Sequence, residues 1–237
     1  MIPIFLILLS FIPNTALSTT FHSFKRLQLP SPGCEAYTFD QNNTGPYTGL
    51  NDGRIVKYDG PKTGLVEYAT TVSNSNITEV LMSGDTSGRL LKYDPKTKQR
   101  TVVLTGLAAP AGVAVSRDGS FVVIAEYLAC RITRLWLKGR RAGQSEVFAE
   151  LPGNPDNIKR TRSGDFWVAV NIQKLYPNVT CFPLGQKINP RGKITQTVNF
   201  YNEYNSTYIT EVHEHDGSLY VASVYTGDVG VYRGLRC

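Results

Sequence analysis

The chain has few of the side chains from which metal and redox centres are built. Its 237 residues include four cysteines and three histidines, and no two cysteines form a Cys-x-x-Cys pair. His213 and His215 share one face of an expected strand, while His22 falls in the expected N-terminal tail. A structural zinc site needs closely spaced ligands of these types, so the sequence argues against one.

Signatures of a serine triad and of a nucleic-acid interface are also missing. No Gly-x-Ser-x-Gly elbow occurs, so local spacing assembles no Ser-His-Asp triad. Charged residues make up only 19% of the chain, and the 25 lysines and arginines behind its net charge of +6 are scattered. Because the densest cluster, Lys138-Gly139-Arg140-Arg141, falls in an expected turn, we expect no nucleic-acid partner.

Long apolar runs are confined to the N-terminus. Met1–Ser18 carries no charged side chain and ends in Ala16-Leu17-Ser18, a small-x-small pattern that predicts a signal peptide. An uncleaved anchor is the alternative, although the run is short and interrupted by proline. We therefore expect residues 19–237 to form a secretory-pathway protein of the vacuole or extracellular space, without a stable membrane span after cleavage.

Sequons and cysteines fit this secretory context. Four Asn-x-Ser/Thr sequons predict a glycoprotein modified at Asn42, Asn76, Asn178 and Asn205. An even number of cysteines in an oxidising compartment predicts one or two disulfides, with the pairing left open, among Cys34, Cys130, Cys181 and Cys237. A buried free thiol is the alternative for Cys130.

What the sequence does contain is a repeated strand pattern. Between Pro110 and Leu151, turns bearing glycine or charge separate four short segments, Ala111–Val115, Phe121–Ala125, Arg131–Leu137 and Glu146–Glu150. The same order of strand, turn and strand returns around Gly164 and Gly217. A module of roughly 40 residues that cannot bury both of its faces alone predicts a single all-β domain built as a β-propeller.

The repeat breaks after its first occurrence. Residues 35–69 supply four strands, whereas Thr70–Gly88 is polar and supplies no inner pair. Arg89–Tyr93 and Thr101–Leu104 then match only the third and fourth strands of a blade. The sequence predicts an internally shortened propeller of about four to four and a half blades. The alternative is a smaller, irregular ring in which Thr70–Gly88 is an ordered bridging loop.

The turn and strand motifs resemble those of plant strictosidine synthase and strictosidine synthase-like proteins. The resemblance covers almost everything after Phe24 and implies a six-bladed, secretory or vacuolar β-propeller. Compared with the usual pattern of that family, this chain lacks a region between Ala69 and about Ser73. The missing region would form roughly one and a half to two blades. The motifs are Gly45-Pro46-Tyr47-Thr48-Gly49, Asp52-Gly53-Arg54-Ile55, Thr86–Asp94, Asp118–Glu126, Gly153–Arg160 and Glu214-His215-Asp216-Gly217.

The resemblance implies a lyase-class reaction of alkaloid metabolism. Strictosidine synthase joins tryptamine to secologanin in a Pictet–Spengler condensation, in which a glutamate handles the protons. That glutamate lies seven residues before the glycine of Glu-His-Asp-Gly, a position that is Thr210 here. A hydroxyl is too weak a base to replace a carboxylate, and the adjacent Glu211 would face the other side of the sheet. We therefore expect a family member with an unknown small-molecule ligand and no condensation activity.

Two alternative functions stay open. Propeller hydrolases similar to paraoxonases and lactonases hold calcium in the central channel; Glu35 and Asn157 match two of their ligands, while Ala111 fails to match a third. This hypothesis predicts a calcium-dependent esterase or lactonase; otherwise no cofactor is expected. The other alternative is a truncated, non-functional product.

Two aromatic residues, Tyr127 and Tyr225, follow strand ends and are the candidates for lining a pocket.

Overall fold

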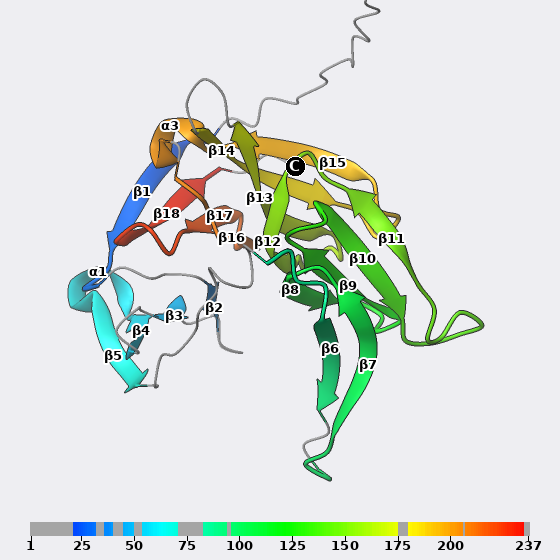
Figure 1. The fold of residues 1–237 in the computed structure, drawn as a ribbon. Coiled ribbons are helices and arrows are strands. Elements are labelled where there is room, and N and C mark those ends of the chain that lie inside the picture. The colour runs from blue at the N-terminus through cyan, green and yellow to red at the C-terminus, as the bar shows by residue number, and fades with distance from the viewer. Residues whose placement is uncertain are drawn as a thin grey trace, which may run out of the picture.

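The computed structural model describes residues 21–31, 36–39, 45–49, 54–70, 83–93, 96–174, 180–205 and 207–234. In that part of the chain the fold is all-β, with two one-turn helices, α1 (Gly60–Thr63) and α3 (Tyr201–Tyr204). The strands form four four-stranded sheets and one two-stranded sheet, arranged as propeller blades (Figure 1). Neither helix is long and apolar enough to cross a membrane.

Strands that follow one another within a blade pair antiparallel. The first blade comprises β2 (Tyr37–Thr38), β3 (Tyr47–Gly49), β4 (Arg54–Tyr58) and β5 (Leu65–Thr70). The two-stranded sheet comprises β6 (Gly88–Tyr93) and β7 (Arg100–Leu107). The β8–β11 blade comprises β8 (Pro110–Val115), β9 (Phe121–Glu126), β10 (Arg131–Trp136) and β11 (Ser145–Glu150). The β12–β15 blade comprises β12 (Asn154–Arg160), β13 (Phe166–Lys174), β14 (Thr180–Ile188) and β15 (Ile194–Asn199). The last blade comprises β16 (Glu211–His215), β17 (Ser218–Ala222), β18 (Asp228–Arg233) and β1 (Ser23–Gln28).

The β8–β11 blade confirms the module expected between Pro110 and Leu151. Its second strand, β9, is buried along its whole length, as a strand with blades on both faces must be. The turn before it is fixed by Asp118, whose carboxylate accepts hydrogen bonds from Ser116 Oγ at 2.8 Å and Ser120 N at 3.0 Å. Gly119 follows with φ +66°, a conformation that glycine adopts without strain.

The last blade is completed by the first strand of the described chain. β1 pairs with β18 from Ser23 opposite Arg233 to Gln28 opposite Asp228. An ion pair of 2.7 Å between Arg26 and Asp228 reinforces this pairing. The assignment of His22 to an N-terminal tail was therefore wrong, because its backbone N–H donates to Arg233 O at 2.7 Å as a continuation of the ladder.

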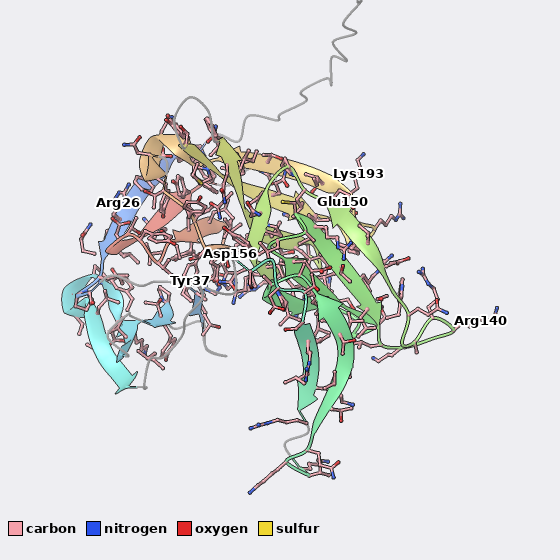
Figure 2. All side chains as sticks on the ribbon, in the orientation of Figure 1. Arg26, Tyr37, Arg140, Glu150, Asp156 and Lys193 are labelled. Atoms are coloured by element: carbon pink, nitrogen blue, oxygen red, sulfur yellow. The ribbon has the colours of Figure 1, made fainter. Side chains whose placement is uncertain are left out.

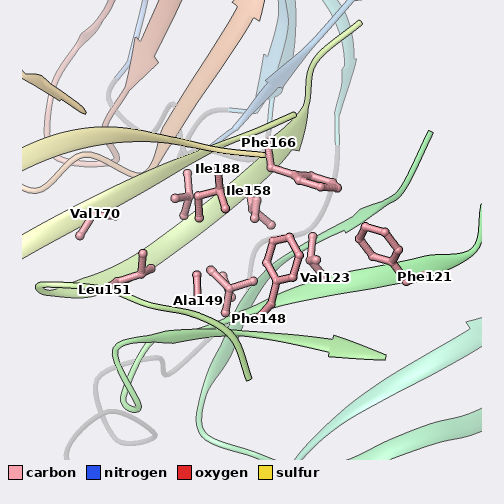
Figure 3. Close-up of a cluster of buried hydrophobic side chains, with 12 residues drawn as sticks. Phe121, Val123, Phe148, Ala149, Leu151, Ile158, Phe166, Val170 and Ile188 are labelled. Carbon is pink, nitrogen blue, oxygen red and sulfur yellow. The ribbon is translucent and has the colours of Figure 1, made fainter. Parts of the chain in front are cut away.

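Apolar clusters join each blade to the next. Figure 3 shows the cluster between β8–β11 and β12–β15, where Phe121 and Phe148 face Phe166 and Ile188. Other clusters join β12–β15 to the last blade, the last blade to β2–β5, and β6–β7 to β8–β11. The order around the axis is therefore β6–β7, β8–β11, β12–β15, the last blade, and β2–β5.

The propeller is incomplete. β6 and β7 pair only with each other among the described residues, which confirms the half blade expected at Arg89–Leu104. None of the four apolar clusters formed by described residues joins β2–β5 to β6–β7, the two ends of the arc. Residues 71–82, which connect these ends in sequence, lie outside the described residues, so the alternative of an ordered bridging loop stays untested.

Candidate functional site

The inner edges of three consecutive blades bring Gly112, Asn157 and Thr210 together. Each residue lies seven positions before the glycine of its blade's first turn, namely Gly119, Gly164 and Gly217. The backbone N–H of Asn157 donates to Thr210 O at 3.0 Å. A Cβ on Gly112 would come within 2.8 Å of Asn157 Cα, so only glycine allows this approach of β8 to β12. Thr210, which the resemblance predicts to occupy the position of the family's glutamate, is 5% exposed.

The residue after Thr210 carries a carboxylate that lies where three blades meet. The Glu211 side chain is fully buried, although it belongs to the innermost strand of its blade. Its Oε1 accepts a hydrogen bond from Tyr37 N on β2 at 3.2 Å, and Lys159 Nζ on β12 lies 3.2 Å from its Oε2. Figure 2 shows Tyr37 near the middle of the molecule. Glu211 is therefore held at the convergence of β2, β12 and β16.

Two histidines extend from this carboxylate toward the first blade. His213 stacks on Tyr37 with ring centroids 5.8 Å apart, and His215 stacks on Phe39 at 3.5 Å. Burial, followed by the positive charges of Lys159 and His215, lowers the pKa of His213 to about 4, so its imidazole is neutral at pH 7. The expectation that both histidines share one strand face is confirmed by their centroid separation of 6.3 Å.

A second group of candidate site residues consists of tyrosines near strand ends. Burial, together with the nearby Tyr208, Asp156 and Tyr225, raises the pKa of Tyr127 to about 12. The Tyr208 and Tyr225 rings lie 6.0 Å apart, and Tyr225 is 69% exposed. The structure thus places the two pocket candidates in one neighbourhood and adds Tyr208, which the sequence did not single out because no strand pattern leads to it. That they line a pocket stays a prediction.

The two candidate calcium ligands are not brought together by the described residues. Asn157 lies at the inner rim, while Glu35 is outside the described part of the chain. Where side chains are described, no group of three or more His, Cys, Asp or Glu residues is arranged to hold a metal ion. Ala111, at the position of the third ligand, is exposed and offers no side-chain oxygen.

Cys130 and Cys181 carry free thiols, which for Cys130 agrees with the alternative of a free thiol; the prediction of one or two disulfides stays untested. Cys130 accepts a hydrogen bond of 3.5 Å from Asn154 Nδ2 through its sulfur. Cys181 donates to Asn171 Oδ1 at 3.6 Å, and burial raises the pKa of its thiol to about 11, so it stays protonated at neutral pH. Cys34 and Cys237 lie outside the described residues.

Of the four predicted glycosylation sites, Asn205 alone falls within the described residues. It is exposed and ends α3 in the left-handed conformation. That geometry leaves its side chain accessible to a glycosyltransferase. The other three sites, Asn42, Asn76 and Asn178, lie outside the described residues. Glycosylation at all four asparagines stays a prediction.

Lys159→Met is expected to raise the pKa of His213 and to destabilise the fold. The ammonium group of Lys159 disfavours protonation of His213 and is the partner of the buried Glu211 carboxylate. Leaving that carboxylate without its cation costs about 1 to 3 kcal/mol of unfolding free energy. NMR titration of the imidazole and urea unfolding measure the two effects, with Lys193→Met, an exposed lysine on the outer rim, as the control. An unchanged His213 titration would contradict the geometry given above.

Comparison with known proteins points to one family. The profile of the family described as strictosidine synthase matches residues 62–140. Protein STRICTOSIDINE SYNTHASE-LIKE 12 of Arabidopsis thaliana is 39% identical over 191 residues, which cover 77% of this chain and 56% of that protein. Strictosidine synthase of Catharanthus roseus is 27% identical over 299 residues, covering 86% and 84% of the two chains. The solved structure of a luciferin-regenerating enzyme covers 84% of this chain and 76% of its own, at 15% identity and a TM-score of 0.46.

The alignment with one relative also indicates how much shorter this chain is. Protein STRICTOSIDINE SYNTHASE-LIKE 11 of Arabidopsis thaliana is 28% identical over 320 aligned positions, which cover 96% of each chain. Because this chain has 237 residues, at least 83 of those positions have no counterpart in it. That length corresponds to about two propeller modules, in agreement with the missing inner strands before β6. The chain belongs to the strictosidine synthase-like family.

Proposed function

We propose that this chain is a strictosidine synthase-like protein of the secretory pathway that does not catalyse the Pictet–Spengler condensation. The observation that carries the proposal is Thr210, a buried hydroxyl at the inner rim where the synthase has its glutamate. The condensation needs a group that is anionic near neutral pH and accepts a proton from the amine. A threonine hydroxyl is not ionised in that range and does not supply this base.

Glu211 does not substitute for the missing carboxylate. Both of its oxygens are engaged, one by Tyr37 N and the other by Lys159. A substrate amine would have to displace the Lys159 ammonium and enter a position from which solvent is excluded. The carboxylate therefore supports the packing of three blades, and its role is structural.

The secretory location rests on the sequence. Met1–Ser18 has the composition of a signal peptide, and four sequons follow it. A small molecule is the expected ligand, and the tyrosine group around Tyr127 and Tyr225 is its candidate binding site, because aromatic rings with one exposed face suit ligand contact. A fluorescent fusion in plant cells, combined with a mass shift on deglycosylation, tests the location; cytosolic fluorescence without a shift would refute it.

The activity is tested with purified protein incubated with tryptamine and secologanin beside the Catharanthus roseus enzyme as positive control. No strictosidine is expected from this chain, and product formation would refute the argument from Thr210.

Aryl esters and lactones, each assayed with calcium and with a chelator, test the hydrolase alternative that involves Glu35 and Asn157. Chelator-sensitive turnover would support that alternative. A cooperative thermal transition is expected for a functional protein, whereas aggregated, protease-sensitive material would support the non-functional one.

A further inference from the structure

Among the described residues, the β6–β7 sheet has a free edge where the other sheets have two more strands. Every other sheet of the described structure contains four strands, and β6–β7 supplies only the outer two of its blade. β6 therefore has a strand partner on one side only, among the residues described. Figure 1 shows this hairpin projecting from the rest of the arc. An unpaired edge of six residues without proline is a template for an added strand.

Apolar side chains that the missing strands would cover are exposed beside this edge. Val113 and Val115 on β8 are 52% and 48% exposed. The residues at the position of Val113 in the next two blades are Ile158 and Glu211, both buried. A Cβ on Gly112 would approach Ile158 N, so the Gly112 side of β8 faces the β12–β15 blade. Val113 is the next residue and therefore projects from the opposite face of β8, which β6–β7 covers farther out. Val113 and Val115 are exposed because no strand of the described residues lies where a full ring would place their neighbours.

The outward face of the hairpin is also apolar at its centre. Leu91 on β6 and Val102 on β7 lie directly opposite each other in the ladder. They are 55% and 47% exposed. Leu90, Val103 and Leu104 instead pack against the next blade, so the hairpin has one buried and one exposed apolar face. The exposed face of the hairpin and the Val113–Val115 stripe flank the position of the missing strands.

Positive charge is concentrated on the same hairpin. Residues 88–107 contain five cations, Arg89, Lys92, Lys96, Lys98 and Arg100, and one acid, Asp94. This segment thus carries +4 of the chain's formal net charge of +6. All five cations are exposed. The charge would attract an acidic partner over distances of about a Debye length, roughly 10 Å at moderate salt.

We propose that the free edge of β6 docks an acidic, extended segment of a partner polypeptide, which pairs with β6 and covers Val113 and Leu91. An alternation of acidic and apolar residues satisfies both the cations of the hairpin and its apolar centre. A second copy of this chain fits less well, because antiparallel self-pairing of β6 about Leu90 and Leu91 sets Arg89 opposite Lys92 of the partner strand. A nucleic acid or other polyanion leaves the apolar side chains uncovered. This surface lies outside the proposed ligand site and does not depend on the proposed function.

The experiment measures binding of a fluorescein-labelled ten-residue peptide of alternating glutamate and valine by fluorescence anisotropy. Saturable binding that weakens at high salt is expected. Two comparison peptides, one with lysine for glutamate and one with prolines at two central positions, are expected not to bind, because the first has the wrong charge and the second cannot form a strand. Leu91→Lys and Val113→Lys are each expected to weaken binding at least tenfold. Val147→Lys, on the outer strand β11 and 48% exposed, is the matched control and is expected to bind normally.

Several results would overturn the proposal. One is the absence of saturable binding, and another is an equal loss with Val147→Lys. Tight binding of the proline-containing peptide would identify a simple polyanion site. A dimer in sedimentation that Leu91→Lys dissociates would identify a second copy as the occupant. Circular dichroism verifies that each variant folds, and slower hydrogen exchange of the Arg89–Tyr93 amides in the wild-type chain on peptide addition provides a readout that needs no variant.

Discussion

Glu126→Ala is expected to lower the free energy of unfolding by about 3 to 5 kcal/mol, a large share of the stability of an ordinary domain. The Glu126 side chain is fully buried at the end of β9. It accepts hydrogen bonds of 2.9 Å from Ala108 N and from Arg131 Nε, and a further one from Thr133 Oγ1. The alanine variant leaves three donors without their acceptor, one of them a cation.

The pKa of Glu126 gives this prediction a pH dependence. Burial alone would raise it, but the hydrogen bonds from Arg131, Ala108 and Thr133 outweigh burial and lower it. A carboxyl whose folded pKa is depressed stabilises the fold above its unfolded pKa of about 4.3. That contribution is lost as the pH falls below this value. The difference in stability between the wild type and Glu126→Ala should therefore narrow in acid.

Urea unfolding at pH 7 measures the effect of Glu126→Ala, and Glu150→Ala is its control. Glu150 is an exposed carboxylate at the end of the neighbouring strand β11, so its loss should change stability by no more than about 0.5 kcal/mol. Glu126→Gln keeps the shape of the side chain but turns one acceptor into a donor, and it should fall between the two. A Glu126→Ala variant within about 1 kcal/mol of wild type would contradict the assigned hydrogen bonds.

Local patterns predicted the strands whose partners are near in sequence. The β8–β11 blade and the half blade β6–β7 follow from apolar segments separated by turns within 40 residues or so. β14 was missed because Pro183 and Gly185 interrupt its pattern, although both residues pair with β13. β1 was missed for another reason: its partner β18 lies at the far end of the chain, and no local signal records that pairing.

In the candidate site, too, local patterns predicted some features, whereas contacts between blades could not be predicted. Counting back from Gly217 singled out Thr210, and the resemblance to calcium-binding propeller hydrolases singled out Asn157; in the structure the Asn157 N–H donates a hydrogen bond to Thr210 O. The role of Glu211 was beyond sequence reasoning, because its partners Tyr37 and Lys159 come from two other blades. Alternation along a strand predicted that His213 and His215 share a face, but the aromatic rings that cover them belong to β2 and the residue after it.

Acidification from pH 7 to pH 4 is expected to destabilise the fold by up to about 3 kcal/mol through His213 alone. Its pKa of about 4 in the folded chain lies well below the value of about 6.5 for an unfolded histidine. Between these values the unfolded state binds more protons, so stability rises with pH. The loss therefore begins as the pH falls through about 6.5 and is complete near 4, with no further contribution from this residue below that.

The pH effect should act on the junction between the last blade and the first. His213 and His215 stack on Tyr37 and Phe39, and the Glu211 carboxylate, 3.9 Å from His213 Nδ1, also accepts the Tyr37 N–H. Protonated His213 would be a cation with Lys159 and His215 near it, and the charges of Glu211 and Glu214 would only partly compensate for its burial. The β2–β5 blade lies at one end of the arc, so weakening this junction exposes it first.

His213→Gln removes the titrating group, and its unfolding free energy should depend less on pH between about 6.5 and 4 than that of the wild type. His22→Gln, which replaces an exposed histidine outside this junction, should keep the wild-type slope. Hydrogen exchange at pH 5 adds the spatial test, because amides of β4 should lose protection before those of β9 and β13. Parallel stability curves for the wild type and His213→Gln would mean that the imidazole titrates at its ordinary pKa. Tyr37 and Phe39 would then not be shielding it from water, and the first blade would not be packed against the last.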